Sequence, residues 1–314
     1  MRHAFVQALC DAAKDDERIF LITGDLGYSI LEPFQDTFPD RFLNIGVAEA
    51  NMITVAAGLS TTGFIPFVYS IVPFATMRPF EQIRNDISFQ NRNVKIIGVG
   101  GGFAYGKAGM THHSVEDIAL MRTLPRMTIV NPCNEREAYQ ATKAVIYSDG
   151  PVYMRLERNP IGATHDALGD FDLERGRTIK NGKHIALIVT GTKLATAQRV
   201  CTLLSSYGID VAVYAFPVIQ PFDTRLLRLI VKKHRIMVTV EEHSIYGGIG
   251  TIVAEFFASI DEPSRSRLIR CGVKHTTRSI SADHTTLTRE HGLSSEYIAA
   301  LCVKEWKKLK RESL

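Results

Sequence analysis

Short apolar segments rich in β-branched residues alternate along this chain with stretches of helical length. Segments such as VKIIGV at 94–99 and HIALIVT at 184–190 lack the strict apolar–polar alternation of a sheet with one solvated face. Strands of this kind are typical of parallel sheets that are covered on both faces by helices. The alternation of the two kinds of segment therefore predicts βαβ units and mostly parallel sheets.

The pattern occurs twice, which predicts two tandem doubly wound α/β domains. We expect a first domain at 1–160, a linker rich in Gly, Asp and Asn at 161–182, and a second domain at 183–314. The strands expected in the first domain are Ile19–Thr23, Phe64–Tyr69, Val94–Val99, Met127–Val130 and Val152–Leu156, with helices at 47–61, 74–90, 115–123 and 134–148. Those expected in the second are His184–Thr190, Asp210–Ala215, Ile236–Val240 and Arg267–Cys271, with helices at 192–207, 223–233, 249–259 and about 294–311.

The composition is that of an ordinary soluble protein. A length of 314 residues suits two domains of about 150 residues each. The net charge of +4 gives no indication of nucleic acid binding, and no apolar run approaches the ~18 residues of a membrane span. The five cysteines are scattered and form no CxxC pair, so we expect reduced thiols, no metal site in this chain and a cytoplasmic location.

One carboxylate stands in an unusual place. The segment NIGVAEANM at 44–52 puts Glu49 in a run of small and apolar residues at the start of an expected helix. Burying a carboxylate is costly unless another group pairs with it. Taken alone, the segment also fits a glutamate that interacts favourably with the dipole at a helix N-terminus. The other motifs of the chain bear on which interpretation holds.

Two segments place polar groups where open α/β sheets bind ligands, at the carboxyl ends of strands. Asp25 and Ser29 lie in TGDLGYS at 23–29, although Gly-Asp turns are common in any protein. His112 lies in VGGGFAYGKAGMTHHSVED at 99–117, where a glycine-rich stretch precedes two adjacent histidines. A single loop histidine is often only structural or exposed.

A third segment, GPVYMRLERNP at 150–160, delivers two arginines, Arg155 and Arg158, to the end of an expected strand. An ordinary surface ion pair of either arginine with Glu157 explains this segment equally well. None of the segments is specific by itself.

Taken together and in order, the segments resemble the carboxyl-terminal half of the transketolase family. The resemblance covers essentially the whole chain, with the family's pyrimidine-binding domain at about 1–160 and its carboxyl-terminal domain at about 183–314. Several long matches in the same order are far more specific than one short motif. The matching pieces are GDLGYS, RFLNIGVAEANM, IPFVYSIVPF, EQIRNDI, THHSVEDIALMRTLPRMTIVNP, GPVYMRL and VTVEEHSIYGGIG.

The resemblance implies thiamine diphosphate as cofactor. Glu49 matches the family's glutamate that hydrogen-bonds N1′ of the cofactor's aminopyrimidine and helps it to lose the thiazolium C2 proton. Phe74 matches the aromatic ring on which the aminopyrimidine stacks. Asp25 and Met77 match positions beside the cofactor. Glu49 is therefore expected to be a catalytic residue.

The resemblance also implies residues that handle the sugar. His112 matches a histidine that lines the substrate channel and moves protons on substrate hydroxyls, which makes it a second expected catalytic residue. Ser29 and Arg158 match positions that hold the phosphate of phosphosugars, and arginine suits this role through bidentate hydrogen bonds.

The chain departs from the family in the substrate channel. Many members have Gly-Glu-Asp-Gly where this chain has Gly-Lys-Ala-Gly at 106–109, and a family histidine near the substrate phosphate falls on Gly100. Met77 replaces a tyrosine of some members. We therefore expect an altered substrate, such as a sulfonated, unphosphorylated or nucleotide-linked sugar, with Lys107 as a replacement anion contact.

The diphosphate-binding half of the family's site is not found in this sequence. Its GDG motif followed by paired asparagines does not occur, because residues 24–27 read GDLG and no Asn-Asn pair is present. The resemblance therefore implies one subunit of a split transketolase. We expect a separate N-terminal-type subunit that holds the diphosphate and Mg²⁺, and an α2β2 assembly with a self-pairing β dimer.

Two alternatives stay open at this point. The β-subunit of a thiamine-dependent 2-oxo acid dehydrogenase shares the two-domain plan, although THHSVEDIALMRTLPRM fits transketolases better. A non-catalytic transketolase-like partner subunit is the other, although such a subunit has no need of a buried Glu49. Fold similarity alone decides neither.

Overall fold

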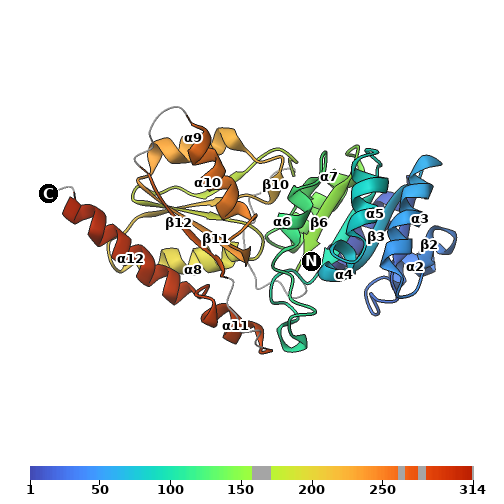
Figure 1. Ribbon diagram of the computed structural model, residues 1–314, viewed down its shortest axis with the longest axis horizontal. Coiled ribbons are helices and arrows are strands. Elements are labelled where there is room, and N and C mark those ends of the chain that lie inside the picture. The colour runs from blue at the N-terminus through green and yellow to red at the C-terminus, as the bar shows by residue number, and fades with distance from the viewer. Residues whose placement is uncertain (158–170, 261–265, 275–280, 313–314) are drawn as a thin grey trace.

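The computed structural model describes residues 1–157, 171–260, 266–274 and 281–312. Two α/β domains lie side by side along the long axis of the molecule, each with helices packed around its own sheet (Figure 1). The predicted fold class, two tandem doubly wound domains, is confirmed. The N-terminal domain carries the segments to which the sequence assigns chemistry.

The first sheet has seven strands in the order β10-β5-β6-β4-β3-β1-β2, and all neighbours except β10 and β5 are parallel. Its strands from the N-terminal half are β1 (Ile19–Thr23), β2 (Phe42–Asn44), β3 (Ile65–Ile71), β4 (Lys95–Val99), β5 (Thr128–Val130) and β6 (Val152–Leu156). The α-helices of this half are α1 (Arg2–Ala13), α2 (Glu32–Thr37), α3 (Glu49–Thr61), α4 (Val72–Thr76), α5 (Phe80–Gln82), α6 (Asp117–Arg122) and α7 (Glu135–Ile146).

The second sheet has five strands in the order β12-β11-β8-β9-β7, and only β7 runs antiparallel to its neighbour. The strands of the C-terminal half are β7 (Arg177–Lys180), β8 (Ile185–Val189), β9 (Val211–Ala215), β10 (Val218–Gln220), β11 (Ile236–Ser244) and β12 (Arg267–Val273). Its helices are α8 (Lys193–Ser205), α9 (Thr224–Lys233), α10 (Ile249–Ser259), α11 (His284–Glu290) and α12 (Ser295–Glu312).

Some elements differ from the sequence prediction. Residues 177–180 of the expected linker form β7, an edge strand whose residues alternate between half-buried and exposed. The three-residue strand β10 crosses from the second half of the chain to pair with β5 of the first sheet. The single helix expected at 74–90 is divided into α4, α5 and a π-helix at 83–88, with a turn at 77–79. Pro79 lies in this turn, where a residue without a backbone N–H interrupts helical bonding.

A fully buried arginine links the two domains. Arg155 on β6 lies 3.2 Å from a carboxylate oxygen of Asp117 and donates to the backbone carbonyls of Ser114 and, in the other domain, Glu242. The hydroxyl of Tyr153 donates to the same carboxylate at 2.6 Å. The interpretation of Arg155 as a surface residue paired with Glu157 is therefore wrong, because its guanidinium points into the domain boundary.

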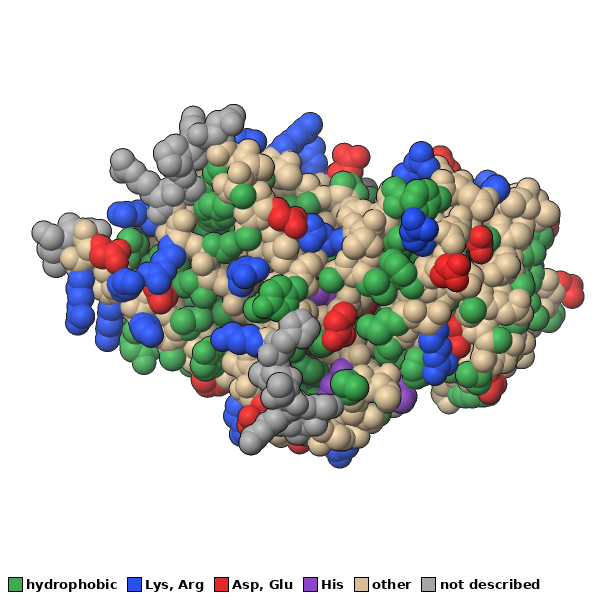
Figure 2. All heavy atoms as spheres, in the orientation of Figure 1, with side chains coloured by type: hydrophobic (Ala, Val, Ile, Leu, Met, Phe, Trp, Pro, Cys, Tyr) green, Lys and Arg blue, Asp and Glu red, His purple; other side chains and the backbone are tan. Residues whose placement is uncertain are grey.

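The sequence ends in a segment rich in basic residues, and these residues lie on the solvated side of α12. Figure 2 shows Lys and Arg side chains gathered over the end of the molecule where Figure 1 places this helix. The exposed basic residues of α12 are Lys304, Lys307, Lys308, Lys310 and Arg311. Among the helices that the structure describes, none combines the length and the apolar character needed to cross a bilayer.

Candidate active site

The carboxyl ends of β1, β2, β3 and β4 bring the predicted site residues to one edge of the first sheet. Asp25 follows β1, Glu49 follows β2, Phe74 follows β3, and His112 lies in the glycine-rich loop after β4. Because these strands are adjacent and parallel, their loops meet at the position where open α/β sheets bind ligands.

Glu49 is buried, with 4% of its surface exposed, at the first position of α3. Both carboxylate oxygens accept hydrogen bonds from Nη1 of Arg78, at 3.2 Å to Oε1 and 3.0 Å to Oε2. Gly24 borders this carboxylate, since a Cβ built on Gly24 would lie in ordinary van der Waals contact, 3.8 Å from Oε1 of Glu49. The burial and pairing that the sequence predicted for this group are therefore present.

A row of planar groups extends across the site. It consists of the side chains of Glu49, Arg78, Phe74 and His112. The guanidinium carbon of Arg78 lies 4.1 Å from the centroid of the Phe74 ring. Phe74 also contacts the His112 ring edge-to-face, with 5.2 Å between the ring centroids. Nδ1 of His112 lies 2.9 Å from the hydroxyl of Thr111. The structure thus brings together Glu49, Phe74 and His112, which are far apart in the sequence.

Asp25 is held beside this row by Asn44, the last residue of β2. The Asn44 side-chain oxygen accepts from the backbone N–H groups of Asp25 and Gly46, each at 3.0 Å, and its amide donates to the Asp25 carboxylate at 3.2 Å. The backbone of Asp25 is left-handed (φ 56°), which is uncommon for a residue other than glycine and is often found at functional sites. Among the residues that the structure describes, no hydrogen bond or ion pair joins Asp25 to Glu49.

Met77 lines an open groove of about 800 Å³ next to Phe74. Most of the side chains around this groove are apolar, and Met77 and Met110 are 37% and 69% exposed. The groove is lined by Pro73, Met77, Phe80, Met110, Thr111, His113, Glu116, Ala119, Leu120 and Thr123.

Two of the residues predicted to contact an anion, Ser29 and Lys107, make their hydrogen bonds to residues outside this row. Ser29 is exposed, and its backbone N–H donates to Glu32 at 2.7 Å. Lys107 is exposed on the glycine-rich loop, where its backbone carbonyl accepts a hydrogen bond from Ser281 at 2.5 Å. Arg158 lies outside the described residues. The roles of these three residues as phosphate or anion contacts stay predictions.

Two residues of the site were not predicted from the sequence. Arg78 contacts both Glu49 and Phe74. The sequence feature that could have drawn attention to Arg78 is its position four residues after Phe74. Tyr105 lies 6.0 Å from the His112 ring between centroids, and its ring fills the space beside Gly100. A Cβ built on Gly100 would lie 2.1 Å from Cε2 of Tyr105, and Gly100 has φ 83°.

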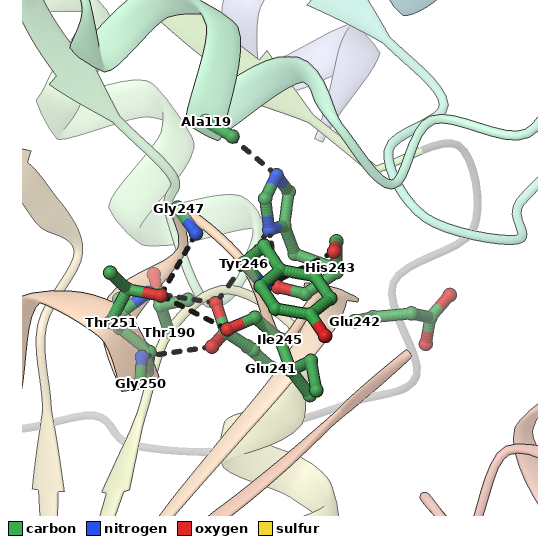
Figure 3. Close-up of polar contacts among 12 residues, drawn as sticks. Ala119, Thr190, Glu241, Glu242, His243, Ile245, Tyr246, Gly247, Gly250 and Thr251 are labelled. Atoms are coloured by element: carbon green, nitrogen blue, oxygen red, sulfur yellow. Dashed lines mark hydrogen bonds and ion pairs between the residues drawn. The ribbon is translucent and has the colours of Figure 1, made fainter. Parts of the chain in front are cut away.

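The motif VEEHSIYGGIG contributes to structure at the domain boundary rather than to this row (Figure 3). The Glu241 carboxylate accepts hydrogen bonds from the backbone N–H groups of Ile249 and Gly250, each at 2.8 Å, at the start of α10. Nε2 of His243 accepts from the backbone N–H of Ala119 in the other domain at 3.3 Å, and Nδ1 lies 2.9 Å from the Ser244 carbonyl. These contacts fix the neutral tautomer that carries its proton on Nδ1.

Burial of His243 predicts a loss of stability in mild acid. Desolvation lowers the pKa of His243 from 6.5 to about 4, so the unfolded chain takes up a proton before the folded one. The resulting stability is present above the unfolded pKa and is lost as the pH falls from 6.5 toward 4. Between about pH 7 and pH 5 the loss amounts to about 2 kcal/mol.

Urea unfolding of the wild type and of His243→Gln at both pH values measures this effect. Glutamine retains an acceptor for the Ala119 N–H but does not titrate, so its stability should fall by about 2 kcal/mol less than that of the wild type over this interval. Equal pH dependence of the two proteins would show that His243 titrates alike in the folded and unfolded states.

Comparison with known proteins matches both domains of the chain to one family. The family model for the transketolase pyrimidine-binding domain matches residues 1–162, and that for the transketolase C-terminal domain matches residues 174–298. The chain belongs to the transketolase family. The resemblance stated from the sequence motifs is confirmed.

Individual relatives of the chain are named as subunits of transketolases. The chain is 32% identical to one subunit of an apulose-4-phosphate transketolase of Actinobacillus succinogenes, over 87% of each protein. It is 34% identical to the 6-deoxy-6-sulfo-D-fructose transketolase subunit SqwH of a Clostridium species, over 81% of this chain and 80% of that protein. A solved structure described as a split-gene transketolase in an inactive β4 tetramer superposes with a TM-score of 0.86 at 32% identity, over 98% of this chain and 97% of the other.

Proposed function

We propose that this chain is the pyrimidine-binding subunit of a split transketolase, which transfers a two-carbon ketol unit between sugars. The observation that carries the proposal is the position of Glu49, a buried carboxylate beside Phe74 at the carboxyl edge of a parallel sheet. Relatives that are named as transketolase subunits, and a solved split-gene transketolase, each match most of the chain and support the same conclusion.

The residues of this edge suit the aminopyrimidine of thiamine diphosphate. Phe74 offers an aromatic face, and the Glu49 carboxylate already accepts two hydrogen bonds from a planar cation stacked on that face. When bound, the cofactor supplies an electron sink for cleavage of the sugar's carbon–carbon bond. Glu49 holds or releases a proton at the ring nitrogen that it faces, and the buried site keeps water from competing for that contact.

His112 is suited to proton transfer on the substrate. Its ring is half-buried, rests edge-on against Phe74, and is oriented by the Thr111 hydroxyl 2.9 Å from Nδ1. A ring held at this point can exchange protons with hydroxyls of a sugar bound next to the cofactor. Asp25 and Met77 complete the surroundings of the cofactor in this proposal.

The remaining part of the site belongs to a partner in this proposal. The residues that the structure describes contain no cluster of His, Cys, Asp and Glu able to hold a metal ion. An N-terminal-type subunit supplies the diphosphate contacts and Mg²⁺, and two copies of each subunit form an α2β2 assembly built on a β dimer. All five cysteines are free, which is consistent with the cytoplasmic location that we propose.

The substrate is proposed to be a sugar other than the ordinary pentose phosphates. The Tyr105 ring occupies the space beside Gly100, the position where the family resemblance places a phosphate-contacting histidine. The matched relatives are named for apulose 4-phosphate and 6-deoxy-6-sulfo-D-fructose, which are a branched and a sulfonated sugar. Lys107, Ser29 and Arg158 are the proposed anion contacts of the altered channel.

Reconstitution tests the proposed function. The chain alone, a candidate partner subunit alone, and the mixture are each assayed with thiamine diphosphate, Mg²⁺ and a panel of pentose phosphates, sulfonated sugars and branched sugars. We expect ketol transfer by the mixture only, with a sugar other than the ordinary linear pentose phosphates as the best donor. Robust activity of the chain alone would refute the split subunit. Best activity on the ordinary linear pentose phosphates would refute the altered channel.

A further inference from the structure

The Arg78 side chain contacts the two groups that the proposed function assigns to the cofactor's aminopyrimidine. Its Nη1 donates to both oxygens of Glu49, and the central carbon of its guanidinium lies over the Phe74 ring, 4.1 Å from the ring centroid. A guanidinium is planar, donates hydrogen bonds and stacks on aromatic faces. An aminopyrimidine bound between the same residues has the same three properties.

The Glu49 and Arg78 side chains of this ion pair are not equally buried. The Glu49 side chain is 4% exposed, whereas the Arg78 side chain is 48% exposed. Arg78 also lies in the turn at 77–79 between α4 and α5, outside any helix, and the open groove beside Met77 adjoins this turn. The cation is therefore able to rotate into solvent, while the carboxylate cannot leave the site.

We propose that Arg78 is a placeholder that occupies the aminopyrimidine position until the cofactor arrives. This inference rests on the proposed function. Without a cation or a ring N–H donor, the buried Glu49 carboxylate has no hydrogen-bond partner among the described residues, and an unpaired buried carboxylate is destabilising. Arg78 keeps the carboxylate paired in the free subunit and swings away when the cofactor donates to it.

The placeholder role makes Arg78 and the cofactor competitors for Glu49. Replacing Arg78 with methionine retains apolar contact with Phe74 but removes the competing donor. We therefore expect thiamine diphosphate to bind the reconstituted complex of Arg78→Met about tenfold more tightly than the wild-type complex, a change of about 1.4 kcal/mol. If Arg78 instead positioned Glu49 for catalysis, Arg78→Met would have the opposite effect and would weaken the binding of thiamine diphosphate.

Isothermal titration of each complex with thiamine diphosphate and Mg²⁺ measures this affinity without any assay of turnover. Arg84→Met is the matched control, because Arg84 also stacks on a phenylalanine, with 4.7 Å to the Phe89 centroid, but contacts Asn85 instead of Glu49. Its affinity should equal that of the wild type. Assembly of every complex is checked by light scattering before titration.

Thermal unfolding of the isolated chain gives a second readout. Arg78→Met should lower Tm by about 2–4 °C because Glu49 loses its partner, whereas Arg84→Met should not. In a Glu49→Gln background, Arg78→Met should lower Tm by less, since the buried side chain is then neutral.

The outcomes separate this inference from the proposed function. Tighter binding by Arg78→Met together with the Glu49-dependent loss of Tm supports the placeholder. Unchanged or weaker binding by Arg78→Met, with normal binding by the wild-type complex, overturns the placeholder and leaves the proposed function intact. Failure of the wild-type complex to bind thiamine diphosphate refutes both.

Discussion

Glu49→Gln is expected to lower kcat of the reconstituted enzyme about 1000-fold while the protein stays folded. Glutamine has nearly the same shape as glutamate and keeps a hydrogen-bond acceptor and donor at the same place. It cannot, however, take up or release a proton at the cofactor's ring nitrogen, which is the role proposed for Glu49. General acid–base groups contribute roughly 100- to 10,000-fold to enzyme rates, which sets the expected range.

Steady-state ketol transfer by the assembled complex measures this loss, and Glu81→Gln is its control. Glu81 lies on α5 near the same sheet edge but is exposed, so its substitution should leave kcat within about twofold. A Glu49→Gln enzyme that retained most of its activity would favour the alternative of a non-catalytic partner subunit. Thermal unfolding of both variants separates lost chemistry from lost structure.

Arg155→Met is expected to destabilise the chain by about 3–5 kcal/mol. The substitution leaves the Asp117 carboxylate buried without its cation, and it leaves the Ser114 and Glu242 carbonyls without the donor that now joins the two domains. The charges around Arg155 raise the pKa of its guanidinium further above the usual range, so the group stays cationic at every accessible pH. Methionine fills most of the volume but supplies none of these hydrogen bonds.

Urea unfolding followed by far-UV circular dichroism measures the destabilisation. An exposed arginine provides the comparison: Arg18→Met breaks an ion pair with Asp16 that is largely solvated on the arginine side and should cost less than about 1 kcal/mol. A cost below about 1 kcal/mol for Arg155→Met as well would mean that the buried pair does not hold the domains together.

The fold was predictable because the strands of a doubly wound sheet carry their own signal. Segments such as 185–189 are buried at every residue, and this burial requires the continuous apolar runs seen in the sequence. Two of the strands that were missed, β10 and β7, lack this property. β10 has three residues and depends on pairing with β5 of the other half, while β7 is an edge strand whose outward residues are polar. Their formation depends on distant partners rather than on local pattern.

The site was predictable only in part, for a similar reason. Glu49 was apparent from the sequence because a carboxylate in an apolar run needs a partner, but the partner itself was not. Arg78 reaches Glu49 because the turn at 77–79 directs its side chain toward the start of α3, and no local pattern encodes that direction. Tyr105 likewise fills the space beside Gly100 through folding of the glycine-rich loop.

The most direct test of the account is a structure of the reconstituted complex with thiamine diphosphate and Mg²⁺. The measurement is the distance from the Glu49 carboxylate to N1′ of the aminopyrimidine. We expect a hydrogen bond of about 2.6–3.0 Å, with the ring stacked on Phe74 and the diphosphate held by the partner subunit. A cofactor bound with N1′ beyond about 4 Å from Glu49, or bound entirely within one kind of subunit, would contradict it.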